Sequence, residues 1–202
     1  KHSYGHSSTI LRNVVWLSPI AIEKKPKTVE ISFFESKAGQ LKFQIYSPDT
    51  TNQGDGERTL HSQGLVEFNG NKSQPSVDVE HFARCCKRPL EISRFYEHMV
   101  SLGLEHGPAY RGIEQFAVGE DSSGVPCAQA LVTLPDNAIS LLEFELHPSL
   151  ADAAAQGGLG LVLGAEAAQR GGLGNSGHPN LPFSLEVAEV FSPLTKEVRV
   201  FA

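Results

Sequence analysis

A single long helix-forming stretch constrains this chain more than any other feature. Ser149 to Arg170 follow Pro148, are rich in Ala and Leu, and begin with a Ser at the position of an N-cap, so the sequence predicts a helix over this range. Four glycines interrupt it, and each costs about 1 kcal/mol against Ala in a helix interior. They are Gly157, Gly158, Gly160 and Gly164. We therefore expect another element to pack closely against this helix.

Short strand-like segments fill the first third of the chain. They are rich in Val, Ile, Phe and Trp, are bounded by Pro, Lys and Gly, and cover Leu11–Leu17, Val29–Phe34, Leu41–Tyr46 and Leu60–Phe68. The third segment alternates between two sets of side chains, which predicts one face in water. A meander of antiparallel strands is the simplest interpretation. The polar stretch Asn69–Ser76 then predicts an internal boundary.

Helix and strand signals mix in the remainder of the chain. Apolar residues at spacings of one, three and four predict a helix over Glu91–Leu102, ended by Gly103. A turn at Glu120–Gly124 separates two strand-like segments and predicts a hairpin. The predicted strands of this part are Ile113–Val118, Cys127–Leu134, Phe183–Phe191 and Glu197–Phe201. Strands followed by strands with a long helix form an α+β pattern.

Charge and composition argue against several classes of protein. The 202 residues carry a net charge of −6 without a block of Lys or Arg, so nucleic acid is not an expected partner. The longest apolar run, Leu159–Ala168, is shorter than the roughly 18 residues of a membrane span, so no membrane partner is expected. Cys85, Cys86 and Cys127 lack C-x-x-C spacing, which favours a reducing cytoplasm over disulfides or zinc. Lys1–Thr9 has no features of a secretory signal.

The most informative segment for chemistry surrounds Asp152. This Asp is flanked by Leu150, Ala151 and three alanines near the start of the long helix. Apolar surroundings disfavour a charged carboxylate, so such a carboxyl can stay protonated and act as an acid. Gln156 lies four residues on, hence on the same helical face, where its amide can orient the carboxyl. From the residues alone, the favoured interpretation is an Asp that caps or is solvated in a first turn, with Gln156 merely polar.

Three segments resemble motifs of polyketide-synthase dehydratases. Asp152 and Gln156 fit the D-x-x-x-Q/H motif of that family, and His147–Leu150 fit the His-Pro-x-Leu that usually precedes it. Gly103–Ile113 is similar to the G-Y-x-Y-G-P-x-F segment, and Leu181–Leu185 is similar to L-P-F-x-W. All three agree in order and rough spacing with the family.

The resemblance extends over nearly the whole chain. Leu11–Ile20 and His61–Gly64 are similar to the first half of such domains. Phe43–Ser47 and Arg84–Gly112 are most similar to synthases that use a separate acyltransferase. The fold that this implies is a double hotdog, two antiparallel sheets each wrapping a helix.

Alignment to the family also implies a division of the chain. We expect residues 1–75 to be part of the N-terminal hotdog, 76–90 a linker, and 91–202 part of the C-terminal hotdog, with both ends of the family domain lacking.

The resemblance implies removal of water from a β-hydroxyacyl thioester. Asp152 and Gln156 would be the catalytic residues, with Asp152 protonating the departing hydroxyl and Gln156 positioning it. The substrate would be carried on the phosphopantetheine of an acyl carrier protein, and neither a metal nor a redox cofactor is required. Neighbouring synthase domains are further implied partners, and a homodimer is compatible with the fold. The substrate-binding residues implied by the motifs are His106, Gly107, Pro108, Tyr110, Leu181, Pro182 and Phe183.

The chain departs from the family at several motif positions. His106 stands where the family usually has Tyr, Tyr110 where it has an aromatic residue without a hydroxyl, and Leu185 where it has Trp. The family takes the α-proton with a His in an H-x-x-x-G-x-x-x-x-P motif, and this spacing does not occur in the 202 residues. By alignment, that motif and the helix of the first hotdog are expected before Lys1.

These departures leave two other hypotheses. A domain of the same fold can close pyran rings, shift double bonds or assist chain branching, and a non-catalytic remnant can bind acyl carrier protein only.

Elsewhere, Cys85 and Cys86 are interpreted as small apolar residues in preference to a reactive thiol pair. Gly171–Gly174 is interpreted as a flexible connector in preference to a phosphate loop.

Overall fold

The computed structural model describes residues 7–22, 24–36, 39–48, 58–70, 74–140, 143–170 and 182–202. The chain divides into two compact units. Unit 1 comprises Lys1–Gln74 and Leu181–Ser192, and unit 2 comprises Pro75–Asn180 and Pro193–Ala202.

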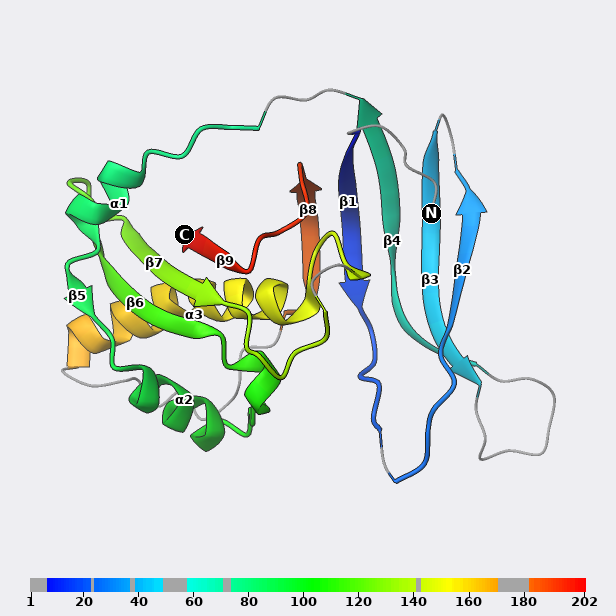
Figure 1. Cartoon of the computed structure of the whole chain (residues 1–202), viewed down its shortest axis with the longest axis horizontal. Helices are drawn as coiled ribbons and strands as arrows, with labels where there is room; N and C mark the ends of the chain where they lie inside the picture. The colour runs from blue at the N-terminus through cyan, green and yellow to red at the C-terminus, as the bar shows by residue number, and fades with distance from the viewer. Residues whose placement is uncertain are drawn as a thin grey trace. The chain divides into compact units, whose positions relative to one another are not determined.

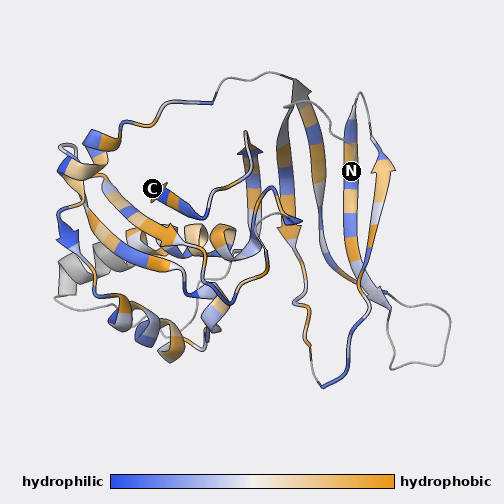
Figure 2. Cartoon of the chain, in the orientation of Figure 1, coloured by the Kyte–Doolittle hydropathy of each residue, from blue (hydrophilic) through white to orange (hydrophobic). Residues whose placement is uncertain are grey.

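Unit 1 contains a five-stranded antiparallel sheet in the order β2-β3-β4-β1-β8 (Figure 1). Its strands are β1 (Ser7–Trp16), β2 (Glu30–Glu35), β3 (Gln40–Pro48), β4 (Arg58–Gly70) and β8 (Ser184–Val190). Hydrophobic and hydrophilic residues alternate along β3, as Figure 2 shows. Phe43 of β3 pairs with Gly64 of β4, and its ring would lie 2.8 Å from a Cβ at Gly64. A glycine at this position therefore lets the aromatic ring cover the neighbouring strand.

Unit 2 contains a four-stranded antiparallel sheet in the order β5-β6-β7-β9. Its strands are β5 (Arg88–Pro89), β6 (Ile113–Glu120), β7 (Pro126–Thr133) and β9 (Glu197–Phe201). The helices are α1 (Val79–Cys85), α2 (Ile92–Ser101), the 3-10 turn η1 (Pro108–Tyr110) and α3 (Pro148–Arg170). Helix α3 packs across β6, β7 and β9, so this sheet wraps a helix (Figure 1).

A close contact between α3 and the sheet forms the centre of unit 2. A Cβ at Gly160 would lie 2.3 Å from the ring of Phe116, which is only 3% exposed, and a Cβ at Gly157 would lie 3.2 Å from Val200. These two glycines confirm the expected close packing, whereas a Cβ at Gly158 would meet nothing within 4 Å. The buried core around this contact consists of Phe95, Tyr96, Met99, Ile113, Phe116, Val118, Ala128, Ala130, Val132, Leu134, Leu150 and Ala153.

The predicted helices and strands are confirmed within one to three residues at most ends, but their grouping is not. The structure divides the chain differently from the expected 1–75, 76–90 and 91–202. Residues 76–90 carry α1 and β5 of unit 2, so they are more than a linker. Strand β8 pairs with β1 in unit 1, whereas β9 pairs with β7 in unit 2. The chain therefore returns once to the first sheet before it completes the second.

The start of α3 also differs from the expectation. The helix begins at Pro148, and the carbonyl of His147 accepts its first hydrogen bond from Ala151 N at 2.9 Å. His147 Nδ1 accepts from Ser149 N at 3.2 Å, so His147 and not Ser149 is the N-cap. The other ring nitrogen, Nε2, donates to the carbonyl of Ile139 at 3.0 Å. This His is 1% exposed and anchors the helix start in the unit.

The thiols of Cys86 and Cys127, each 5% exposed, lie 3.4 Å apart, and the Cys85 sulfur contacts His81. Burial raises the pKa of all three thiols, that of Cys127 to about 11, which is opposite to the lowered pKa of a reactive thiol. Within the described residues, no helix has the length and apolar character needed to cross a membrane.

The two glycines of α3 give a matched pair of substitutions. Gly160→Ala should lower the free energy of unfolding by about 1–2 kcal/mol, because overpacking against Phe116 outweighs the gain in helix propensity. Gly158→Ala should raise it by roughly 0.5–1 kcal/mol, since its Cβ is unobstructed. Denaturant titration of the two variants measures both values. Equal stabilisation by both substitutions would contradict the close contact.

The buried thiols predict a loss of stability at alkaline pH. An unfolded Cys ionises near 9.0 and the folded Cys127 only at about 11, so folding favours the protonated thiol. The contribution of the Cys127 thiol to the free energy of unfolding is complete below pH 9.0 and is lost as the pH rises through about 11. Thermal unfolding of the parent and Cys127→Ala between pH 8 and 11 should show a shallower decline in the variant. Parallel declines would exclude this thiol as a cause.

Candidate active site

Asp152 and Gln156 lie one turn apart on α3 and contact each other directly. Gln156 Nε2 donates to Asp152 Oδ2 at 2.6 Å. The i, i+4 spacing predicted this contact, because residues four apart stack on one face of a helix. A donated N–H fixes one carboxyl oxygen as an acceptor and thereby orients the whole group.

Gln156 itself is held by three hydrogen bonds. Its Nε2 also donates to the carbonyl of Tyr110 at 3.1 Å, and its Oε1 accepts from the hydroxyl of Tyr96 at 3.2 Å. The side chain is 3% exposed, so every polar atom of a buried amide has a partner. Tyr96 lies within the apolar pattern that predicted α2. The signal for a further role was its hydroxyl, which needs a partner when the ring is buried.

The segment after α2 brings a carbonyl and an imidazole to α3. Gly103 has a φ of 83°, which a glycine adopts without strain and which ends the helix. Tyr110 N then donates to the carbonyl of Gly107 at 2.9 Å, forming the turn that begins at Pro108. Gly107 and Pro108 are exposed and shape this turn. Arg111 Nε donates to the carbonyl of His106 at 2.8 Å and closes it.

His106 lies beside the Asp152 carboxyl. Its Nε2 is 3.9 Å from Asp152 Oδ2, and its side chain is 17% exposed. The other ring nitrogen, Nδ1, is buried and has no hydrogen-bond partner. The ring also meets Tyr96 edge-on, with 6.1 Å between centroids. His106, which stands where the family usually has Tyr, thus places a second titratable side chain 3.9 Å from the Asp152 carboxyl.

The Asp152 side chain is more exposed than its sequence neighbours suggest. It is 42% exposed, so the expected desolvation by Leu150 and the alanines is not seen in the structure. The reason is the helical period, since adjacent residues point in directions about 100° apart. Leu150 and Ala153 are fully buried in the core, while Asp152 lies on another side of α3. Its polar environment comes from Gln156 and His106 instead.

The remaining predicted site residues lie in unit 1. Pro182 and Phe183 line a hollow of about 620 Å³ together with Trp16, and Leu181 lies outside the described residues. His61 lines the same hollow, but both its ring nitrogens are engaged, with Ser47 Oγ at 2.8 Å and with the carbonyl of Ser18 at 3.1 Å. This His is therefore a structural residue of the sheet.

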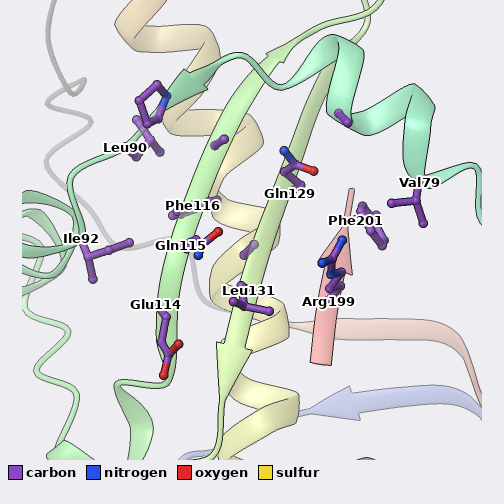
Figure 3. Close-up of a pocket in the computed structure, with 14 residues that line it drawn as sticks. Val79, Leu90, Ile92, Glu114, Gln115, Phe116, Gln129, Leu131, Arg199 and Phe201 are labelled. Carbon is purple, nitrogen blue, oxygen red and sulfur yellow. The ribbon is translucent and has the colours of Figure 1, made fainter. Parts of the chain in front are cut away.

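A second hollow, of about 530 Å³, lies in unit 2. Figure 3 shows it between α1 and the strands, with Gln115, Gln129 and Leu131 on the side of the sheet away from α3. Asp152, Gln156 and His106 do not line it. The hydrogen-bonded group on α3 is therefore the better candidate for chemistry than this hollow.

Comparison with known proteins agrees with these features. A sequence profile described as "Polyketide synthase dehydratase N-terminal domain" matches residues 74–202. Polyketide synthase PksN from Bacillus subtilis is 32% identical over 194 residues, which is 94% of this chain and 3% of PksN. The chain thus spans a small part of the curated relatives it matches.

Solved structures show the same fold. A dehydratase domain of a trans-AT polyketide synthase from Brevibacillus brevis is 31% identical, with a TM-score of 0.78 over 93% of this chain and 61% of that chain. The CurK dehydratase domain of the curacin synthase is 22% identical, with a TM-score of 0.81 over 98% of this chain and 65% of that chain. A CurK variant with Asn in place of an Asp is described as inactive.

Two antiparallel sheets, the second wrapped around α3, are thus those of a double hotdog, as the sequence predicted. The sequence profile covers more than half of the chain. The chain belongs to the polyketide synthase dehydratase family.

Proposed function

We propose that this chain supplies the acid half of a dehydratase site that acts on a β-hydroxyacyl thioester. The observation that carries the proposal is the 2.6 Å hydrogen bond from Gln156 Nε2 to Asp152 Oδ2. Gln156 holds Oδ2 as an acceptor, so the transferable proton of the protonated carboxyl is carried by Oδ1. An inactive Asp-to-Asn variant of the CurK domain supports an essential Asp in the family.

In the proposed reaction, the C–H bond at the α-carbon breaks and its electrons form the double bond. The bond from the β-carbon to the hydroxyl breaks at the same time, and Asp152 protonates the leaving oxygen, so that water departs. The products are an α,β-unsaturated thioester and water. We assign no residue of this chain to the base that removes the α-proton, because the family's H-x-x-x-G-x-x-x-x-P spacing does not occur in the sequence.

The proposed substrate is carried by an acyl carrier protein. Membership in the dehydratase family supports a phosphopantetheine-bound acyl chain and neighbouring synthase domains. The similarity to the Brevibacillus brevis domain supports a synthase of the trans-acyltransferase type. Elimination of water moves protons and changes no overall oxidation state, so the proposed reaction requires no redox cofactor.

The substrate-binding roles of the other motif residues are part of the proposal. His106 and Tyr110 lie on the turn that contacts α3, and Gly107 and Pro108 shape that turn. A substrate oxygen near Asp152 would be within reach of His106 Nε2, which lies 3.9 Å from Asp152 Oδ2.

His106 also favours a second candidate function. A double-bond shift moves a proton from the γ-carbon to the α-carbon without loss of water. Two titratable groups whose atoms lie 3.9 Å apart, as in the pair of His106 Nε2 and Asp152 Oδ2, can together remove and return such a proton. This function differs from dehydration in the mass of the product, so one assay separates the two.

The test uses the longest natural polypeptide that contains this chain, incubated with an acyl carrier protein loaded with a 3-hydroxyacyl group. Mass spectrometry should show loss of one water, and Asp152→Asn should slow it by at least about 100-fold, the usual contribution of a general acid. Asp136→Asn is the matched control, because Asp136 is exposed and bonds only Lys196 among the described contacts.

An Asp152→Asn variant as fast as the parent would overturn the assignment of the acid. Isomerisation of an unsaturated acyl group without dehydration would favour the double-bond shift. A parent that changes neither substrate would leave binding of the carrier protein as the remaining hypothesis.

A further inference from the structure

The hydroxyl of Tyr96 connects α2 to the catalytic candidates on α3. The side chain is 7% exposed and belongs to the buried core of unit 2. Its Oη donates to Gln156 Oε1 at 3.2 Å. A buried tyrosine hydroxyl needs a hydrogen-bond partner, and the partner here is the residue that bonds Asp152.

The direction of each hydrogen bond is fixed by its neighbours. The carbonyl of Tyr110 can only accept, so the Gln156 nitrogen must face it at 3.1 Å. The amide oxygen then faces Tyr96, which must be the donor of that bond. The bonds therefore run in one direction, from Tyr96 through Gln156 to Asp152 Oδ2.

This order makes Tyr96 a constant donor. Burial raises the pKa of the Tyr96 hydroxyl, and the nearby charge of Asp152 raises it further, against the lowering effects of the Ile113 N–H and of Arg111. The hydroxyl therefore keeps its proton throughout the neutral range. Hydrogen bonds in a chain polarise one another, so a donated proton at Oε1 strengthens donation from Nε2.

We propose that Tyr96 is a positioning residue that acts through Gln156. Its hydroxyl holds the Gln156 amide in one orientation, and the amide in turn holds Asp152 Oδ2 and leaves Oδ1 free to deliver a proton. Without the hydroxyl, the buried Oε1 has lost its donor, and the amide can rotate away from the carboxyl. The catalytic part of this inference rests on the proposed dehydration.

The first test is Tyr96→Phe, which keeps the ring and removes only the hydroxyl. We expect kcat for water loss to fall about three- to tenfold with KM unchanged, which is the range of a single hydrogen bond. Tyr46→Phe is the matched control, because its hydroxyl also makes a side-chain hydrogen bond, to Ser32 at 2.7 Å, but in unit 1. The control should stay within about twofold of the parent in kcat. Melting temperatures of all variants check that they fold.

A double-mutant cycle separates positioning from general stability. In a Gln156→Ala background Tyr96 can no longer act on Asp152 through the amide. Adding Tyr96→Phe should therefore change kcat by less than about twofold. A purely structural Tyr96 would lower kcat by the same factor in both backgrounds, and that result would overturn the proposal.

A second readout does not depend on activity. The two side-chain amide protons of Gln156 are both hydrogen-bonded, so their exchange with water, measured by NMR, should be slow in the parent. Tyr96→Phe should accelerate it at least about threefold, and Tyr46→Phe should not. An unchanged exchange rate of the Gln156 amide protons in Tyr96→Phe would overturn the proposal that Tyr96 positions Gln156. An inactive parent with the expected exchange rates would count against the proposed dehydration only.

Discussion

The close approach of α3 to the sheet of unit 2 is the contact on which the candidate site depends. Leu150, Ala153, Gly157 and Gly160 follow one another at spacings of three and four, so they form a single face of small and apolar residues. The last two have no side chain to separate the helix from Val200 and Phe116. Once this face is fixed on the sheet, the helical period fixes a second face that carries Asp152 and Gln156. The glycines that weaken the helix intrinsically therefore set the position of its polar residues.

The polar face is held by hydrogen bonds that leave little freedom. At the start of α3, the buried His147 caps the helix and bonds the carbonyl of Ile139. One turn after Asp152, the amide of Gln156 is shared among a carboxyl, a carbonyl and a hydroxyl. Such a fully satisfied buried network favours one arrangement, since any rotation leaves a buried polar atom without a partner. The exposed Asp152 carboxyl can thus be accessible to a substrate and still be well oriented.

Local sequence patterns predict much of this arrangement. The grouping of the strands, the N-cap of α3 and the exposure of Asp152 could not be predicted, each for a physical reason. Periodicity predicted α2, α3 and the strands, and the i, i+4 spacing predicted the contact of Asp152 with Gln156. The separation of β8 and β9 into different sheets was not predicted, because strand pairing is set by long-range contacts that no local pattern encodes. The N-cap was misplaced because His147 is an uncommon capping residue. The burial of Asp152 was overestimated because sequence neighbours on a helix point to different sides.

The most direct test of the central claim is exchange of the substrate's β-hydroxyl oxygen with water. A 3-hydroxyacyl group on its carrier protein is incubated in ¹⁸O-labelled water with the longest natural polypeptide that contains this chain, and the mass of the remaining 3-hydroxyacyl group is followed. If elimination is reversible and Asp152 is the acid, the parent should incorporate ¹⁸O into the 3-hydroxyacyl group. The Asp152→Asn variant should incorporate none. Label incorporated equally by both proteins would contradict the claim that Asp152, oriented by Gln156, donates the proton to the leaving oxygen.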